Sequence, residues 1–186
     1  MIERLHVLKL LKKAKKAALR NDIFELKNLS DQTIHSVSIY QDEDNMLAAI
    51  LMYALAKLIE RKEKYSSEDF EKYLKLFLRT LDDSISCIDK DVCEEFRGNV
   101  SSMLKESEKL PKEFKDDVQF IFRKARINKA SKVYEHGISM EKTAKLLGIS
   151  QWELAEYVGP MGASEYPQTQ TLDIRKRIKK AMEFFE

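Results

Sequence analysis

The fold of this chain is indicated most clearly by residues 129–159, which read KASKVYEHGISMEKTAKLLGISQWELAEYVG. Gly148 separates two short helical patterns, and glycine readily adopts the left-handed conformation that ends a helix. Ser150 and Glu153 then show the Ser-x-x-Glu spacing of a capping box, and Ala144 is small enough for two helices to cross closely. This pattern predicts a helix-turn-helix, a unit that commonly presents its second helix to the major groove of DNA.

The charge of the second predicted helix points less clearly to DNA. Residues 151–158 contain Glu153 and Glu156 and no Lys or Arg, whereas a surface that lies against phosphates usually carries positive charge. Helix-turn-helix units also dock proteins or serve as structural elements. Nucleic-acid binding, protein interaction and structural packing are therefore three open interpretations of this segment.

The distribution of helix-breaking residues indicates the fold class. The 186-residue chain has only 5 Gly and 3 Pro, and neither type occurs before Gly98. Because helix interiors tolerate these residues least, a run of 97 residues without them predicts an all-α protein. We expect a multi-helix bundle over residues 1–125, the helix-turn-helix over residues 126–159, and an extended loop plus a C-terminal basic amphipathic helix over residues 160–186.

Apolar periodicity predicts helices near residues 2–20, 42–62, 66–88, 91–109, 112–135 and 172–185. The apolar run from Met46 to Ala56 predicts a helix that is buried on all sides. Residues 36–40 alternate as a strand would, but no strand partner is apparent, so we predict a short helix or an ordered loop for residues 21–41. The helix from residue 112 could continue unbroken to Gly137, in which case a rigid rod would join the bundle to the helix-turn-helix.

Charge is unevenly distributed along the chain. Residues 1–20 carry seven basic residues (Lys or Arg) and one acidic residue. Residues 21–120 carry 14 basic and 22 acidic residues, and residues 121–186 carry 12 basic and 8 acidic residues. Basic ends around an acidic middle indicate an anionic partner for the ends. The alternative is that the basic ends fold onto the acidic middle, and both interpretations stay open.

Residues that would carry catalysis or bind a metal are sparse. The spacing of Cys87 and Cys93 fits neither a disulfide framework nor a metal site. Glu3 and His6 form a Glu-x-x-His pair, but a diiron bundle needs a second such pair and two further carboxylates. The sequence has no Gly-rich phosphate-binding loop and no Gly-x-Ser-x-Gly. We therefore expect the protein not to be an enzyme and to have no cofactor and no metal.

No segment is expected to enter a membrane. The longest apolar run has eleven residues, fewer than the roughly 20 that span a bilayer. Charged residues interrupt the apolar ones at the start of the chain, which argues against a secretory signal. Two cysteines suit a reducing compartment, and we expect a cytoplasmic protein.

A family resemblance is carried by a set of positions between Asn128 and Gly159, namely Lys129, Ala130, Tyr134, Gly137, Ile138, Ser139, Ala144, Leu147, Gly148, Ile149, Ser150, Trp152 and Glu153. In these positions the segment resembles the helix-turn-helix of small prokaryotic and archaeal antitoxins that pair with PIN-domain ribonuclease toxins. The resemblance implies a DNA-binding autoregulator with a C-terminal tail that docks on a toxin, and the alternative is an archaeal protein that uses the same module for another purpose. Residues 160–171 and 172–185 would stand in for that tail.

We expect a DNA-binding regulator, with RNA as the alternative nucleic acid. Because Gln suits adenine and Glu suits cytosine, base edges would be met by Ser150, Gln151, Trp152 and Glu156. Phosphates would be held by basic side chains, namely Lys129, Lys132, Lys142, Lys145, Arg175, Lys176, Arg177, Lys179 and Lys180. A homodimer is expected because one short helix reads only a few base pairs. The alternative is a protein-interaction adaptor in which the acidic second helix and Trp152 dock a partner.

Overall fold

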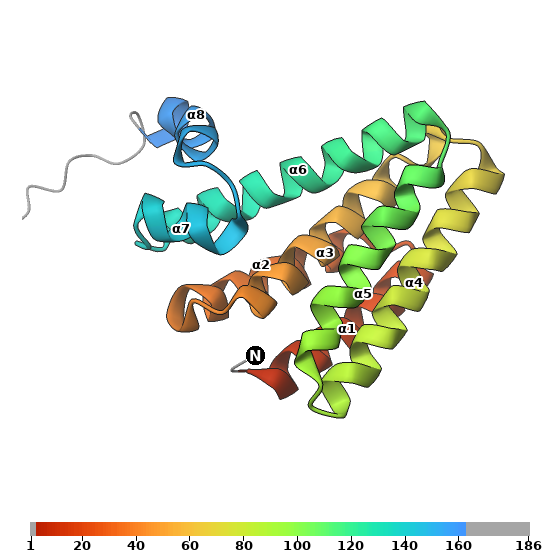
Figure 1. Ribbon diagram of the computed structural model, residues 1–186, viewed down its shortest axis with the longest axis horizontal. Helices are drawn as coiled ribbons and strands as arrows, with labels where there is room; N and C mark the ends of the chain where they lie inside the picture. The colour runs from red at the N-terminus through yellow and green to blue at the C-terminus, as the bar shows by residue number, and fades with distance from the viewer. Residues whose placement is uncertain (1–2, 163–186) are drawn as a thin grey trace, which may run out of the picture.

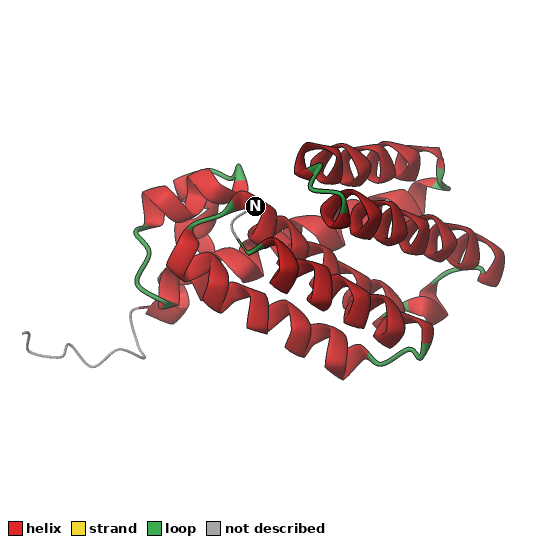
Figure 2. Cartoon of the chain, turned by 90° about the horizontal axis from the view of Figure 1, so that it is seen from below, coloured by secondary structure: helices red, strands yellow, loops and turns green. Residues whose placement is uncertain are grey.

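The computed structural model describes residues 3–162, apart from the side chains of residues 93, 94 and 159–162. Within this range the chain folds into α-helices and two short 3-10 helices, without a strand (Figure 1, Figure 2). The elements are α1 (Arg4–Leu19), α2 (Ile23–Tyr40), α3 (Glu43–Glu60), η1 (Lys62–Lys64), α4 (Ser67–Asp89), α5 (Cys93–Glu106), η2 (Ser107–Lys109), α6 (Lys112–Glu135), α7 (Met140–Leu147) and α8 (Gln151–Gly162). The all-α prediction is confirmed for this part of the chain.

Two groups of helices cross each other in the bundle formed by α1 to α6 (Figure 1). α2 and α3 form an antiparallel pair, and α6 lies along α3. α4 and α5 form a second pair, and α1 packs against α2, α3 and α4, so that it joins the two groups. α7 and α8 pack against α6 at one end of the molecule, where α7 also contacts α3.

α3 is the central helix of the core. Met46, Leu51 and Leu55 have 1 % or less of their surface exposed, and buried residues surround the helix axis. A helix that is apolar on all sides is stable only when other elements cover it, and α1, α2, α5, α6 and α7 do so here. The prediction of a helix buried on all sides is confirmed.

The short helix or loop predicted for residues 21–41 is wrong, because the 18-residue helix α2 spans most of this range. Asp22 caps its start by accepting a hydrogen bond from the backbone N–H of Glu25 at 3.0 Å. Ser30 Oγ donates to the Ala49 carbonyl of α3 at 2.6 Å, so a serine that would weaken an isolated helix is satisfied at the helix contact. Packing against α3 therefore decides the conformation of this segment.

The basic first helix packs as part of the bundle. Its apolar face, which includes Leu11, is buried. On its polar side Lys15 Nζ lies 2.5 Å from an Asp82 carboxylate oxygen, and Arg4 Nε lies 3.6 Å from Asp91. This end of the chain therefore folds onto the acidic middle, as in the second of the two interpretations of the charge distribution.

α6 joins the bundle to α7 and α8. It is one unbroken helix that ends at Glu135, before Gly137, whose φ of +89° turns the chain in a way that favours glycine. It contacts α2 and α3 as well as α7 and α8, and so provides the rigid connection considered from the sequence. The boundary predicted between residues 125 and 126 falls inside this helix.

The C-terminal part of the prediction lies outside the described residues, including the basic cluster Arg175, Lys176, Arg177, Lys179 and Lys180. α8 reaches Gly162 and so continues past Gly159, where we expected a loop to begin. Pro160 lacks a backbone donor, and this weakens a helix without always ending it.

Candidate functional site

α7 and α8 are joined by a tight connection that the local sequence explains. Gly148 has φ +61° and ψ 35°, and the N–H of Ile149 donates to the Ala144 carbonyl at 3.1 Å. Ser150 Oγ then accepts a hydrogen bond from the Glu153 N–H at 3.1 Å, while the Glu153 carboxylate accepts one from the Ser150 N–H at 3.1 Å. This reciprocal capping box, predicted from the sequence, fixes where α8 begins and how it is aimed.

The buried side of α8 determines which of its residues face solvent. Leu154 and Val158 are buried against the neighbouring helices, with 0 % and 7 % of their surface exposed. Trp152 and Glu156 lie on the opposite side of the helix and are exposed, and Gln151, the first residue of α8, is exposed although it falls on the same side as Leu154 and Val158. Trp152, the single tryptophan of the chain, has 86 % of its surface exposed. The structure thus leaves three of the four predicted base-reading residues exposed, with Trp152 and Glu156 on one face of α8 and Gln151 at its first position.

Ser150, the fourth predicted base-reading residue, is already engaged. It is exposed, but both its hydroxyl and its N–H bond to Glu153. Arg123 of α6 also donates to the Glu153 carboxylate, from Nη2 at 3.2 Å. The backbone and hydroxyl hydrogen bonds of Ser150, followed by the charge of Arg123, hold the pKa of Glu153 below its usual value. A carboxylate charged at neutral pH therefore stabilises the start of α8.

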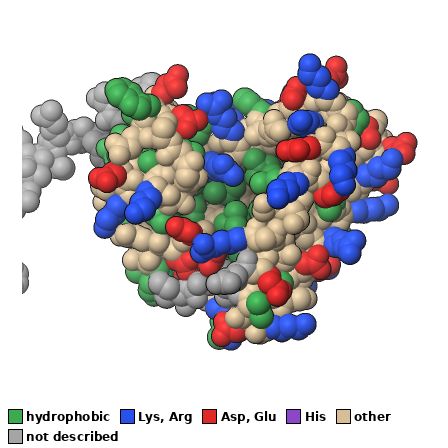
Figure 3. Space-filling model, in the orientation of Figure 1, with side chains coloured by type: hydrophobic (Ala, Val, Ile, Leu, Met, Phe, Trp, Pro, Cys, Tyr) green, Lys and Arg blue, Asp and Glu red, His purple; other side chains and the backbone are tan. Residues whose placement is uncertain are grey.

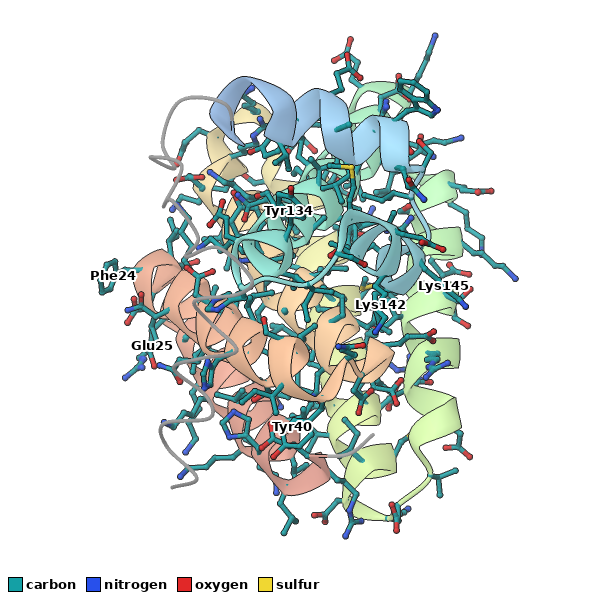
Figure 4. The ribbon with its side chains drawn as sticks, turned by 90° about the vertical axis from the view of Figure 1, so that its left-hand side faces the viewer. Phe24, Glu25, Tyr40, Tyr134, Lys142 and Lys145 are labelled. Atoms are coloured by element: carbon teal, nitrogen blue, oxygen red, sulfur yellow. The ribbon has the colours of Figure 1, made fainter. Side chains whose placement is uncertain are left out.

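Two of the predicted phosphate-binding lysines lie on the surface. Lys142 and Lys145 are exposed on α7 and, being three residues apart, share one face of that helix. Figure 4 shows them close together on α7, away from Phe24 and Glu25 at the start of α2. No carboxylate in the part of the chain that the structure describes pairs with either lysine.

Two more of the predicted lysines, Lys129 and Lys132, are held by an aspartate of α2. Lys129 has no exposed surface, and its Nζ lies 2.7 Å from one Asp31 carboxylate oxygen and 4.4 Å from the centre of the Tyr53 ring. Lys132 Nζ lies 2.6 Å from the other Asp31 oxygen. A side chain without exposed surface cannot reach a phosphate, which corrects the prediction for Lys129. Lys132 is partly exposed but engaged by Asp31.

Burial has the largest effect on the pKa of the Lys129 ammonium group. It lowers the pKa of Lys129 to about 8, against the opposing effect of Asp31. The sequence contained a signal for this position. Lys129 lies four residues after Ala125 and four before Val133, both of which are on the buried face of α6.

Sequence reasoning missed two arginines of α6 that lie beside the α7–α8 connection. Arg123 contacts α8 through Glu153, and Arg126 lines a hollow of about 320 Å³ together with Leu147 and Gly148. Figure 3 shows a hollow on this face with apolar side chains on its floor and both basic and acidic side chains around it, and its lining includes Arg97 and Glu43. Both arginines of α6 are exposed, and their spacing of three residues on one helix was the available signal. They place positive charge beside α8, which has none of its own between residues 151 and 158.

Among the side chains that the structure describes, which exclude those of residues 93, 94 and 159–162, no group of three or more His, Cys, Asp or Glu could hold a metal ion. Over residues 3–162, no helix combines the length and the apolar character that crossing a bilayer requires.

Comparison of the chain with protein-family models, with curated proteins and with solved structures found no match. The resemblance to antitoxins stays a prediction, and the function has to be argued from the geometry of the chain itself.

Proposed function

We propose that the protein binds nucleic acid, with duplex DNA as its first ligand, through the outward face of α8. The observation that carries the proposal is the exposed pair Gln151 and Trp152 at the start of a helix that a capping box and a buried face hold in place. Gln151 offers a donor and an acceptor to a base edge. Trp152 offers a flat apolar surface, and Glu156, about one turn further, offers an acceptor for the amino group of cytosine.

Positive charge on the neighbouring helices supports contact with phosphates. Lys142 and Lys145 lie on α7, and Arg123 and Arg126 lie on α6 beside the connection to α8. In this arrangement α8 reads base edges while the adjoining helices meet the backbone on either side of the groove. The cluster of residues 175–180 would add further phosphate contacts.

The short length of α8 favours a dimer. One short helix contacts only a few base pairs, so selective binding requires two copies on two half-sites. We therefore propose a homodimeric regulator of the antitoxin-like kind.

A protein partner for the same face is the second candidate. It is favoured by the 86 % exposure of Trp152, because tryptophan is enriched among the residues that dominate protein interfaces. It is also favoured by the absence of Lys and Arg from residues 151–158.

Fluorescence anisotropy of labelled duplex fragments at about 50 mM salt, where phosphate contacts are strongest, tests the proposal. The double variant Lys142→Ala, Lys145→Ala should weaken binding to all sequences alike. The matched control Lys72→Ala, Lys75→Ala neutralises two exposed lysines of α4 and should leave binding unchanged. Failure to bind any duplex would overturn the proposal. A protein partner that survives nuclease treatment and is lost with Trp152→Ala would favour the second candidate.

A further inference from the structure

A cleft on another side of α6 combines aromatic rings with cations. It has a volume of about 240 Å³ and lies between α3, α6 and α8. Its rings and cations are Tyr53 and Lys57 of α3, Arg61 directly after α3, Phe120 and Lys124 of α6, and Tyr157 of α8. The cleft is separate from the hollow lined by Arg126, because two residues of an α-helix correspond to about 200° of rotation between Arg126 and Lys124.

The cations of the cleft lie over its rings. Lys124 Nζ is 5.7 Å from the centre of the Phe120 ring and 5.8 Å from that of Tyr157, so it lies between helices α6 and α8. The Arg61 guanidinium is 5.4 Å from the Phe120 ring centre, and Lys57 Nζ is 5.8 Å from that of Tyr53. Rings alternating with cations form the surface on which proteins stack the bases of single strands while holding their phosphates.

The charge of the cleft is not fully balanced. Arg61 pairs with Asp117 at 2.5 Å, and Lys57 pairs with Glu60 at 2.6 Å. Lys124 has no carboxylate within ion-pair distance among the residues that the structure describes, and none of the residues lining the cleft is acidic. An anion that entered would therefore meet at least one cation that no carboxylate neutralises.

Asn128 supplies a polar group that has no partner. It lines the cleft, and its Oδ1 is shielded from solvent without a hydrogen bond. Buried acceptors are rarely left in this state, because the missing bond costs stability. A ligand that carries an N–H group, such as the exocyclic amine or ring N–H of a nucleobase, would satisfy it once the Asn128 side chain turned toward the cleft, because Oδ1 is shielded in its present position.

We propose that this cleft binds a nucleotide, either as an unpaired unit of a single strand or as a free mononucleotide. The base stacks on the rings of Phe120 and Tyr157 and donates to Asn128 after that side chain has turned toward the cleft, and the phosphate meets Lys124 and Arg61. The cleft is smaller than the roughly 300–1,000 Å³ of pockets that enclose drug-sized ligands, so it suits a single base. The strand-bound form rests on the proposed nucleic-acid binding, whereas the mononucleotide form does not.

The test uses the full chain with four probes, namely AMP, inorganic phosphate, a labelled oligothymidylate and a labelled DNA duplex. Calorimetry measures the binding of AMP and phosphate, and fluorescence anisotropy measures the binding of the oligothymidylate and the duplex. Phe120→Leu keeps an apolar side chain but removes the ring, and should weaken binding of AMP and oligothymidylate by about 5- to 100-fold. Lys124→Gln should weaken the binding of AMP and of oligothymidylate, and should reduce the salt dependence of oligothymidylate binding. Phe24→Leu and Lys75→Gln, at exposed positions elsewhere, are the matched controls and should bind normally.

Folding of the variants can be checked independently. Phe120 has 45 % of its surface exposed, so Phe120→Leu should melt close to the wild-type temperature. Tyr157→Phe keeps the ring and should retain binding, which separates stacking from the loss of a hydroxyl.

The outcomes distinguish this inference from the proposed function. Duplex binding without binding of AMP or oligothymidylate would overturn the nucleotide site and leave the proposed function standing. Binding of AMP without binding of any polynucleotide would support a mononucleotide site and overturn the proposed function. Inorganic phosphate that binds as tightly as AMP, or wild-type binding by Phe120→Leu, would overturn base recognition in the cleft.

Discussion

Replacing the buried lysine of α6 by methionine should remove a pH dependence from the stability of the fold. The pKa of Lys129 falls to about 8 in the folded protein from 10.5 in its ordinary state, because burial disfavours the charged form. Between these values the unfolded chain holds a proton that the folded chain has released, so the free energy of unfolding rises with pH in this window. With these two pKa values, the free energy of unfolding should rise by about 2 kcal/mol from pH 8 to pH 10.

Lys129→Met has a similar length and no titrating group, so this rise should be absent. Asp31 remains paired with Lys132 and keeps 43 % of its side chain exposed, so the variant does not strand its carboxylate. Urea unfolding followed by circular dichroism at pH 8, 9 and 10 measures the effect, with Lys142→Met as an exposed control. Above pH 10 the trend reverses, because burial raises the pKa of Tyr73. Equal pH dependence in wild type and Lys129→Met between pH 8 and 10 would refute the reasoning.

Three further predictions concern the α7–α8 unit, the first of them in comparison with a glycine of α5. Gly148→Ala should destabilise the protein by about 1 kcal/mol, because a Cβ is strained at φ +61°. Gly98→Ala in α5, where an added Cβ meets nothing within 4 Å, should instead stabilise by up to about 1 kcal/mol. Urea unfolding of the two glycine variants measures these changes, and changes of the same sign in the free energy of unfolding would contradict the prediction. Ser150→Ala should lower the free energy of unfolding by about 1 kcal/mol through loss of the cap, and an unchanged unfolding midpoint would show that the cap is not stabilising. Trp152→Ala should change stability by less than about 0.5 kcal/mol but weaken DNA binding, and a large loss of stability would contradict its exposed position.

Features set by local sequence were predictable. The Gly148 turn and the Ser150–Glu153 capping box depend on residues at most a few positions apart, so their pattern determines their geometry. The burial of α3 follows from an apolar run from Met46 to Ala56 that no partly exposed helix would tolerate.

Features set by packing between distant segments were not predictable in the same way. α2 is helical because its inner face, including Ser30, is satisfied against α3, and its own sequence favours no single conformation. The position of Lys129 on the buried face of α6 can be inferred from its spacing, but its partner Asp31 lies 98 residues earlier in the chain and could not be. The cleft around Lys124 is assembled from three helices, so no single stretch of sequence contains its pattern.

The most direct test of the central claim uses the single tryptophan of the chain as a probe of α8. Trp152 is 86 % exposed in the free protein, so a neutral quencher such as acrylamide should quench its emission efficiently. If α8 is the surface that meets DNA, adding duplex at low salt should change this emission and protect Trp152 from the quencher, and raising the salt should reverse both effects. Duplex that binds by anisotropy while the emission and quenching of Trp152 stay unchanged would contradict the assignment of the binding surface to α8.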